Sequence, residues 1–132
     1  MKINRLDHLV LTVADVESAC AFYQELLGME VITFGNNRKA LLFGNQKINL
    51  HQKGKEIDPK AAFPTCGSGD LCFIADTPVE EVLQELESKK ITILEGGIVD
   101  RTGATGKIRS VYFRDPDNNL IEVSNYANIP VV

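Results

Sequence analysis

The order of structural signals in this chain repeats once, and this repeat is the feature that most constrains its fold. An apolar segment at 6–13 predicts a strand, and apolar residues at helical spacing from Val16 to Leu27 predict a helix that Gly28 ends. Three strand candidates follow, at 29–34, 39–43 and 47–51. The first half is therefore expected to fold as a βαβββ module.

The second half shows the same order after a connector at 52–69 that is rich in proline and glycine. A strand is predicted at 70–75, and Thr77-Pro78-Val79-Glu80 predicts a capping box at the start of a helix. Further strands are expected at 91–94, 108–113 and 119–123, with a turn at 115–118. The 132 residues thus predict one α+β domain of two βαβββ modules, at about 1–60 and about 66–132, whose strands form a curved mixed sheet with the helices behind it.

Four potential metal ligands lie on the predicted strands: His8, His51, Asp70 and Glu122. Side chains alternate across a strand, and the apolar neighbours of all four define the face that packs under the helices. All four are therefore expected on the opposite face. His8 is expected to correspond to Asp70 on the first strand of each half, and His51 to Glu122 on the last. Imidazole and carboxylate groups that converge in this way favour a divalent-metal site.

Composition excludes several classes of function. A net charge of −4 without a basic stripe argues against nucleic acid or an anionic membrane as the partner. No apolar run approaches the length of a membrane span, and the first residues lack a signal peptide's apolar region. Cys20, Cys66 and Cys72 have no framework spacing, so we expect reduced thiols in a cytoplasmic protein.

Three segments resemble the vicinal oxygen chelate superfamily, which includes glyoxalase I, fosfomycin-modifying enzymes, methylmalonyl-CoA epimerase and extradiol dioxygenases. They are the strand at 8–13, Phe22-Tyr23 through Leu26-Leu27-Gly28-Met29, and the run from Tyr112 to Asn119 that leads into Glu122. The whole sequence is most similar to glyoxalase domain-containing 5-like proteins. The resemblance implies a cup of two modules with a divalent metal (Zn, Ni, Mn or Fe) at its base, usually in a homodimer that acts on a small molecule.

The sequence departs from these relatives at two positions. Glyoxalase I and the epimerase have His at the first-strand position of both halves, whereas this chain has Asp70 at the second. It has His51 where bacterial glyoxalase I has a carboxylate. Two imidazoles and two carboxylates are thus kept, with one pair exchanged.

Three functions stay open from the sequence. The first is a glyoxalase I-like lyase or isomerase, in which the metal is a Lewis acid that stabilises an enediolate and Glu122, or else Asp70, is the base. The second is an Fe(II) extradiol-type dioxygenase with His8, His51 and Glu122 as a 2-His-1-carboxylate set. The third is a non-catalytic small-molecule-binding protein of the resistance type. Substrate contacts are expected from four further residues: Asn49, Arg109, Ser110 and Tyr112.

Overall fold

The computed structural model describes residues 1–127, which form two compact units. Unit 1 comprises Met1–Gly69 with Pro116–Asn118, and unit 2 comprises Asp70–Asp115 with the segment that begins at Asn119. Each unit contains one helix and one four-stranded sheet. The α+β architecture of two βαβββ modules is therefore confirmed.

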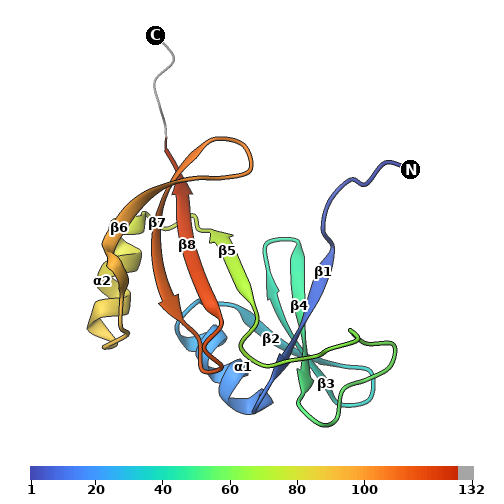
Figure 1. The fold of residues 1–132 in the computed structure, drawn as a ribbon. Coiled ribbons are helices and arrows are strands. Elements are labelled where there is room, and N and C mark those ends of the chain that lie inside the picture. Colours follow the sequence, from blue (N-terminus) through green and yellow to red (C-terminus); the bar gives the residue numbers. More distant parts are fainter. Residues whose placement is uncertain (128–132) are drawn as a thin grey trace. The chain divides into compact units, whose positions relative to one another are not determined.

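Unit 1 runs β1 (His8–Val13), α1 (Val16–Glu25), β2 (Glu30–Phe34), β3 (Arg38–Phe43) and β4 (Gln46–Gln52) (Figure 1). The sheet order is β1-β4-β3-β2, in which β1 and β4 are parallel and the other pairs antiparallel. Gly28 follows the helix with a φ of 67°, a conformation that favours glycine, so the predicted helix stop is confirmed.

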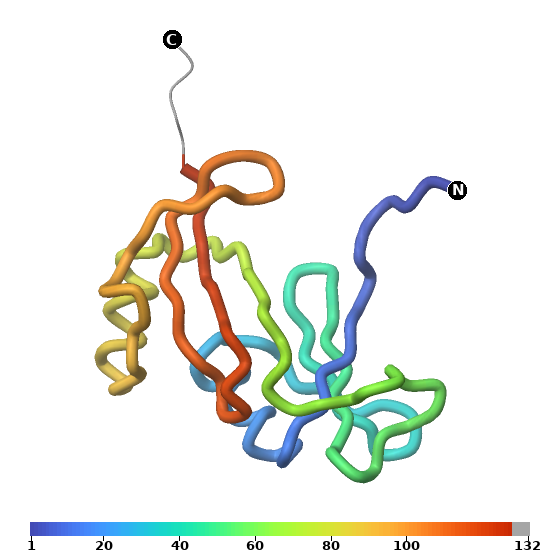
Figure 2. The backbone as a smooth tube through the Cα atoms, in the orientation of Figure 1, coloured from blue at the N-terminus to red at the C-terminus, as the bar shows by residue number. Residues whose placement is uncertain are grey.

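Unit 2 repeats this order with β5 (Asp70–Ile74), α2 (Val79–Ser88), β6 (Leu94–Thr102), β7 (Lys107–Arg114) and β8 (Leu120–Tyr126). The sheet order β5-β8-β7-β6 matches that of unit 1 element for element. Figure 2 shows β5 and β8 running side by side, in green and red. The repeat in the sequence is thus a repeat in the strand topology.

The predicted strand at 91–94 is wrong, because β6 begins only at Leu94 and extends to Thr102. Glu95, Gly96 and Gly97 all have positive φ, and the register between β6 and β7 shifts between Leu94 and Val99. This irregularity lies inside the strand. Gly96 and Gly97 indicated the end of a strand, whereas β6 resumes pairing with β7 beyond them.

Each sheet has one face under its helix, and we call the opposite one the open face. Helix α1 contacts β2, β3 and β4, and α2 contacts β6, β7 and β8. Leu41, Ile48, Val111 and Phe113 lie on the helix-covered faces and are almost fully buried. The open faces carry the alternate residues, and these include exposed apolar side chains such as Val10. Alternation therefore identified the helix-covered face of each sheet correctly.

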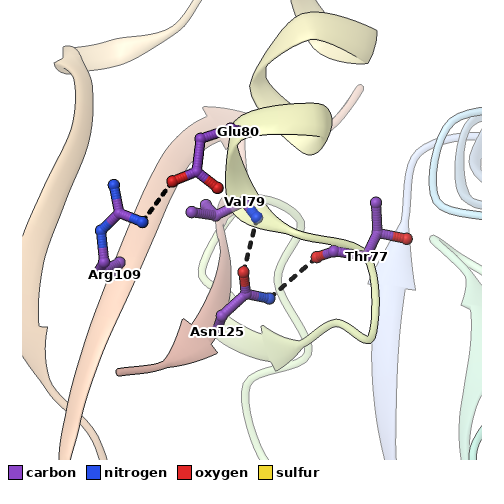
Figure 3. Close-up of polar contacts among 5 residues, drawn as sticks. All are labelled: Thr77, Val79, Glu80, Arg109 and Asn125. Atoms are coloured by element: carbon purple, nitrogen blue, oxygen red, sulfur yellow. Dashed lines mark hydrogen bonds and ion pairs between the residues drawn. The ribbon is translucent and has the colours of Figure 1, made fainter. Parts of the chain in front are cut away.

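The predicted capping box at Thr77 does not form. Helix α2 begins at Val79 without a side-chain cap from its own turn, and the Val79 N–H donates instead to Asn125 Oδ1 on β8, at 2.6 Å (Figure 3). Asn125 Nδ2 donates to the carbonyls of Ala75 and Thr77, at 3.0 Å each. A side chain from the far end of the unit thus satisfies the orphan donor at the helix start.

Helix α1 is capped in the same manner from the last strand of unit 1. Asp15 makes no side-chain cap bond, and the Val16 N–H donates to Gln52 Oε1 at 3.0 Å. Gln52 Nε2 donates to the Ala14 carbonyl at 2.5 Å. Gln52 follows His51 and Asn125 follows Ser124, and these two residues occupy equivalent register positions, so the two units use one capping design.

The described part of the chain has no helix that is long and apolar enough to cross a membrane. Cys20, Cys66 and Cys72 are free thiols.

Candidate functional site

The open face of unit 2 carries a carboxylate that is held by hydroxyl groups. Glu122 on β8 accepts a hydrogen bond from Ser110 Oγ on β7 through Oε2, at 2.6 Å. Ser124 Oγ lies 2.7 Å from Ser110 Oγ and 3.4 Å from the same Glu122 oxygen. Ser110 and Ser124 are both fully buried. The buried serines therefore fix one carboxylate oxygen of Glu122.

The direction of these hydrogen bonds follows from the proton each hydroxyl has to give. Ser110 gives its proton to Glu122, and it can then only accept from Ser124. Ser124 in turn accepts from the thiol of Cys72, whose Sγ lies 3.4 Å from Ser124 Oγ. The hydrogen bonds thus run from Cys72 to Ser124, from Ser124 to Ser110 and from Ser110 to the Glu122 carboxylate. Glu122 is the acidic group among these four residues.

Tyr112 lies directly across from Glu122 in the β7–β8 register. Burial raises the pKa of Tyr112, the Glu122 carboxylate adds to this, and Arg101 opposes it. The Arg101 guanidinium lies 5.4 Å from the centre of the Tyr112 ring. Burial also raises the pKa of the Cys72 thiol. Both groups are consequently neutral donors near pH 7.

Asp70 lies on the same open face as Glu122, at the start of the neighbouring strand. Glu122 pairs with Cys72, so Asp70 is two residues away along β5 and its side chain points to the same side. Asp70 is exposed, whereas Glu122 is half-buried. The two predicted carboxylates therefore share one face of one unit, as alternation indicated.

Arg109 was expected to contact substrate, but it lies on the helix-covered face. It pairs with Asn125 in the sheet and forms an ion pair with Glu80 at the start of α2 (Figure 3). Ser110, the next residue, points to the open face with Glu122. Arg109 has the opposite parity from Ser110 and Tyr112, so it lies away from the open face, and its contact with a substrate stays a prediction.

In unit 1, His8 begins β1 on the open face and is exposed. Its Nδ1 lies 2.8 Å from Asp7 Oδ2. Metal-bound histidines commonly have one ring nitrogen held by a carboxylate in this way, which leaves the other for the ion. The neighbourhood of His8 thus fits a role as a metal ligand.

The expected correspondence between His51 and Glu122 is wrong by two residues. Glu122 pairs with Cys72, two residues into β5, and the residue that pairs two residues into β1 is Asn49. His51 instead pairs with Thr12 and corresponds to Ser124. His8 and His51 are consequently offset by four residues on adjacent parallel strands, or about 13 Å along them. They share a face, but the register separates them.

Asn49 lies on the open face of unit 1, as expected, and is 6% exposed. Its Oδ1 is buried and has no hydrogen-bond partner in the described part of the chain. A buried acceptor without a partner is unfavourable, so it marks a place where a ligand donor would be stabilised.

A divalent metal is implied by the family that the sequence resembles, and the donor chemistry of the two open faces fits one. Asp70 and Glu122 are hard oxygen donors, and His8 is a borderline nitrogen donor. Among residues 1–127, no three His, Cys, Asp or Glu side chains form a cluster that is placed to hold a metal ion. His8 belongs to unit 1 and both carboxylates belong to unit 2.

Ser124 shares the parity of Glu122 and was expected on the same face, but its hydrogen bond with Ser110 is visible only in the structure. Arg38 was missed because the strand was expected to begin one residue later, at Lys39.

Comparison with known proteins identifies the family. Residues 5–123 match the model of the Glyoxalase/Bleomycin resistance protein/Dioxygenase superfamily. Virulence protein STM3117 of Salmonella typhimurium is 58% identical over 96% of this chain and 88% of its own length. Its crystal structure superposes with a TM-score of 0.94 over 96% of this chain and 100% of that one.

Two further relatives extend the comparison. Glyoxalase domain-containing protein RDO1 of Mycosarcoma maydis is 52% identical over 97% of this chain and 72% of its own length. Lactoylglutathione lyase from Agrobacterium tumefaciens shares the fold, with a TM-score of 0.72 at 24% identity over 94% of this chain and 95% of that one. The chain belongs to the glyoxalase/bleomycin resistance/dioxygenase superfamily, also known as the vicinal oxygen chelate superfamily.

Proposed function

We propose that this protein is a metal-dependent glyoxalase I-like lyase or isomerase that acts on a small substrate with vicinal oxygens. The observation that carries the proposal is the Glu122 carboxylate on the open face of unit 2, which accepts a hydrogen bond from the buried Ser110 and lies opposite Tyr112. An ionised carboxylate has about four lone-pair sites, so the hydrogen bond from Ser110 still leaves it able to accept a proton. A fixed carboxylate with that capacity is suited to general-base catalysis.

In this mechanism Glu122 accepts a proton from the substrate carbon next to a carbonyl group and returns it to the adjacent carbon. The reaction is an isomerisation, so no oxidant or reductant is consumed. Ser110 keeps Oε2 in place while the proton moves, and Tyr112 is available to donate to a substrate oxygen. Asp70 is the alternative base, because it lies on the same face and is open to solvent.

The proposed metal ligands are His8, Asp70 and Glu122. When bound, a divalent metal supplies Lewis acidity toward the vicinal oxygens of the substrate. We leave His51 out of the set, because its register position corresponds to Ser124 and not to Glu122. The same offset removes support from the dioxygenase alternative, since that function requires His51 beside His8.

Metal binding tests the ligand assignment. Protein purified without added metal is expected to bind about one equivalent of a divalent ion after reconstitution, and H8N, D70N and E122Q are expected to lower this, whereas H51N is not. Metal content below about a tenth of an equivalent, without recovery on reconstitution, would contradict both enzyme hypotheses and favour the binding protein. Loss of metal in H51N, in addition to its loss in the other three variants, would restore the four-residue assignment.

Activity tests the chemistry. The adducts of methylglyoxal with glutathione and with a second small thiol serve as probes, and product formation is followed by thioester absorbance. E122Q is expected to lower kcat/KM by about 10²–10⁴-fold, the range of a general base. E87Q, the same substitution at an exposed position on α2, is the matched control and should stay within about twofold. Oxygen uptake with catechols, in place of adduct turnover, would support the dioxygenase instead.

The homodimer that the resemblance implies is part of the proposal. Sedimentation analysis at several protein concentrations tests it directly.

A further inference from the structure

A pocket of about 370 Å³ lies in unit 1, where β4 ends and β3 and α1 begin. Its lining includes Arg38 of β3, His51 and Gln52 of β4, and Lys55 from the segment that follows. Glu17 of α1 also contributes to the wall. All of these residues belong to unit 1. The proposed reaction uses none of them.

Two of the lining side chains are donors that the fold leaves without a partner. His51 is 5% exposed, and in the described part of the chain its ring makes no hydrogen bond. Arg38 Nε is buried and likewise has no partner there. A buried donor without an acceptor is unfavourable, so such groups commonly mark a site for a ligand.

The charges that reach the pocket are predominantly positive. Within residues 1–127, Arg38 and Lys55 form no ion pair. Lys39 donates to Thr33 Oγ1 at 2.6 Å, and Gln52 is occupied at both ends in capping α1. Glu17 is the one acid in the lining. Two cations that remain available therefore outweigh it.

The guanidinium of Arg38 is already oriented. It stacks over the Phe34 ring, with its Cζ 4.7 Å from the ring centre. Lys47 Nζ lies 4.5 Å from the same ring and adds to the positive potential of the open face. A stacked guanidinium loses less side-chain freedom when it binds an anion, and its planar donors match the geometry of an oxyanion.

Glu56 near His51 is the group that opposes anion binding. Its Oε2 is buried without a partner in the described residues. Burial lowers the pKa of His51 and Arg38 lowers it further, while Glu56 acts in the opposite direction. His51 is therefore a neutral ring near pH 7, with one N–H to donate.

We propose that this pocket binds a small oxyanion group, a carboxylate or a tetrahedral oxyanion, between Arg38, His51 and Lys55. Arg38 supplies charge and directed donors, His51 supplies a ring N–H, and Lys55 supplies an exposed charge at the rim. The proposal concerns unit 1 alone and does not depend on the metal or on the chemistry at Glu122.

The test uses sodium sulfate and sodium acetate as probes, with sodium chloride at matched ionic strength as the reference. NMR follows the Arg38 Nε–H signal and the ring signals of His51, which are assigned by comparison with H8N because the chain has two histidines. Saturable shifts of both side chains by sulfate or acetate are expected, and the probe that binds more tightly shows which oxyanion geometry the pocket prefers.

Variants locate the site. R38M keeps an apolar side chain over Phe34 and is expected to weaken binding by at least about tenfold, since a charge-assisted hydrogen bond contributes more than 1.4 kcal/mol. K55Q is expected to weaken it about two- to fivefold. K53Q is the matched control, because Lys53 is an exposed lysine outside the lining, and it should have no measurable effect.

Two results would overturn the proposal. One is a response to both probes that equals the response to chloride. The other is equal weakening by K55Q and K53Q, which would indicate general screening of surface charge. Both lysines are exposed, so this comparison remains decisive even if R38M perturbs the fold.

Discussion

The capping of α2 by Asn125 leads to a prediction that separates tertiary structure from local sequence. Thr77 stands where the sequence predicts the helix cap, yet the hydrogen bond to the Val79 N–H comes from Asn125 Oδ1 on β8 (Figure 3). N125A should therefore destabilise the protein and T77A should not. The local capping-box reading predicts the reverse, because Thr at an N-cap is normally stabilising.

The size of the effect follows from the hydrogen bonds that are lost. Asn125 makes three of them, one to Val79 at 2.6 Å and two to the carbonyls of Ala75 and Thr77 at 3.0 Å. Each contributes about 1 kcal/mol net, and partial exposure lets water replace part of this. We expect N125A to lower the free energy of unfolding by about 2–3 kcal/mol. T77A leaves the Thr77 carbonyl in place and should cost less than about 0.5 kcal/mol.

Two measurements check this prediction. Urea unfolding gives the loss of stability, and amide hydrogen exchange reports on the Val79 N–H itself, which should exchange at least about tenfold faster in N125A. N125D keeps an acceptor for Val79 and loses both donors, so its stability should lie between those of the wild type and N125A. The reasoning is refuted if T77A costs as much as N125A, or if N125A leaves exchange at Val79 unchanged.

Two further predictions concern a glycine and an ion pair. Gly67 has a φ of 80°, and a Cβ there would lie 2.6 Å from the Asp117 carbonyl oxygen. G67A should therefore lower the free energy of unfolding in urea by about 1–3 kcal/mol, and G44A, which has open space around it, should lower it less. Hydrogen bonding to Arg109 lowers the pKa of Glu80, so this pair stabilises the fold above the ordinary carboxyl pKa and ceases to do so as pH falls through the lowered value. R109M should return the Glu80 pKa toward 4.5 in an NMR titration, and an unchanged pKa would exclude the ion pair in solution.

The sequence determined the modules, the faces of their strands and the position of Glu122. Alternation of apolar residues is a local signal that shows which face of a strand is buried under the helix. Asp70 and Glu122 therefore fall on one face, as predicted. Arg109 was expected to contact substrate because of its charge, whereas its parity places it on the helix-covered face. The strand β6 was misread because Gly96 and Gly97 also mark turns, and only pairing with β7 shows that the strand continues.

Only the tertiary structure decided which residues in different strands meet. The repeated order of elements paired His51 with Glu122, because both lie on the last strand of their half. The register of β1 against β4 gives that position to Asn49 and leaves His51 in the pocket with Arg38. Hydrogen bonds between strands fix the register, and a shift of two residues preserves parity, so no alternation pattern reveals it. The capping of α1 by Gln52 and of α2 by Asn125 could not be predicted from the sequence either, because contacts between residues distant in the chain leave no local pattern.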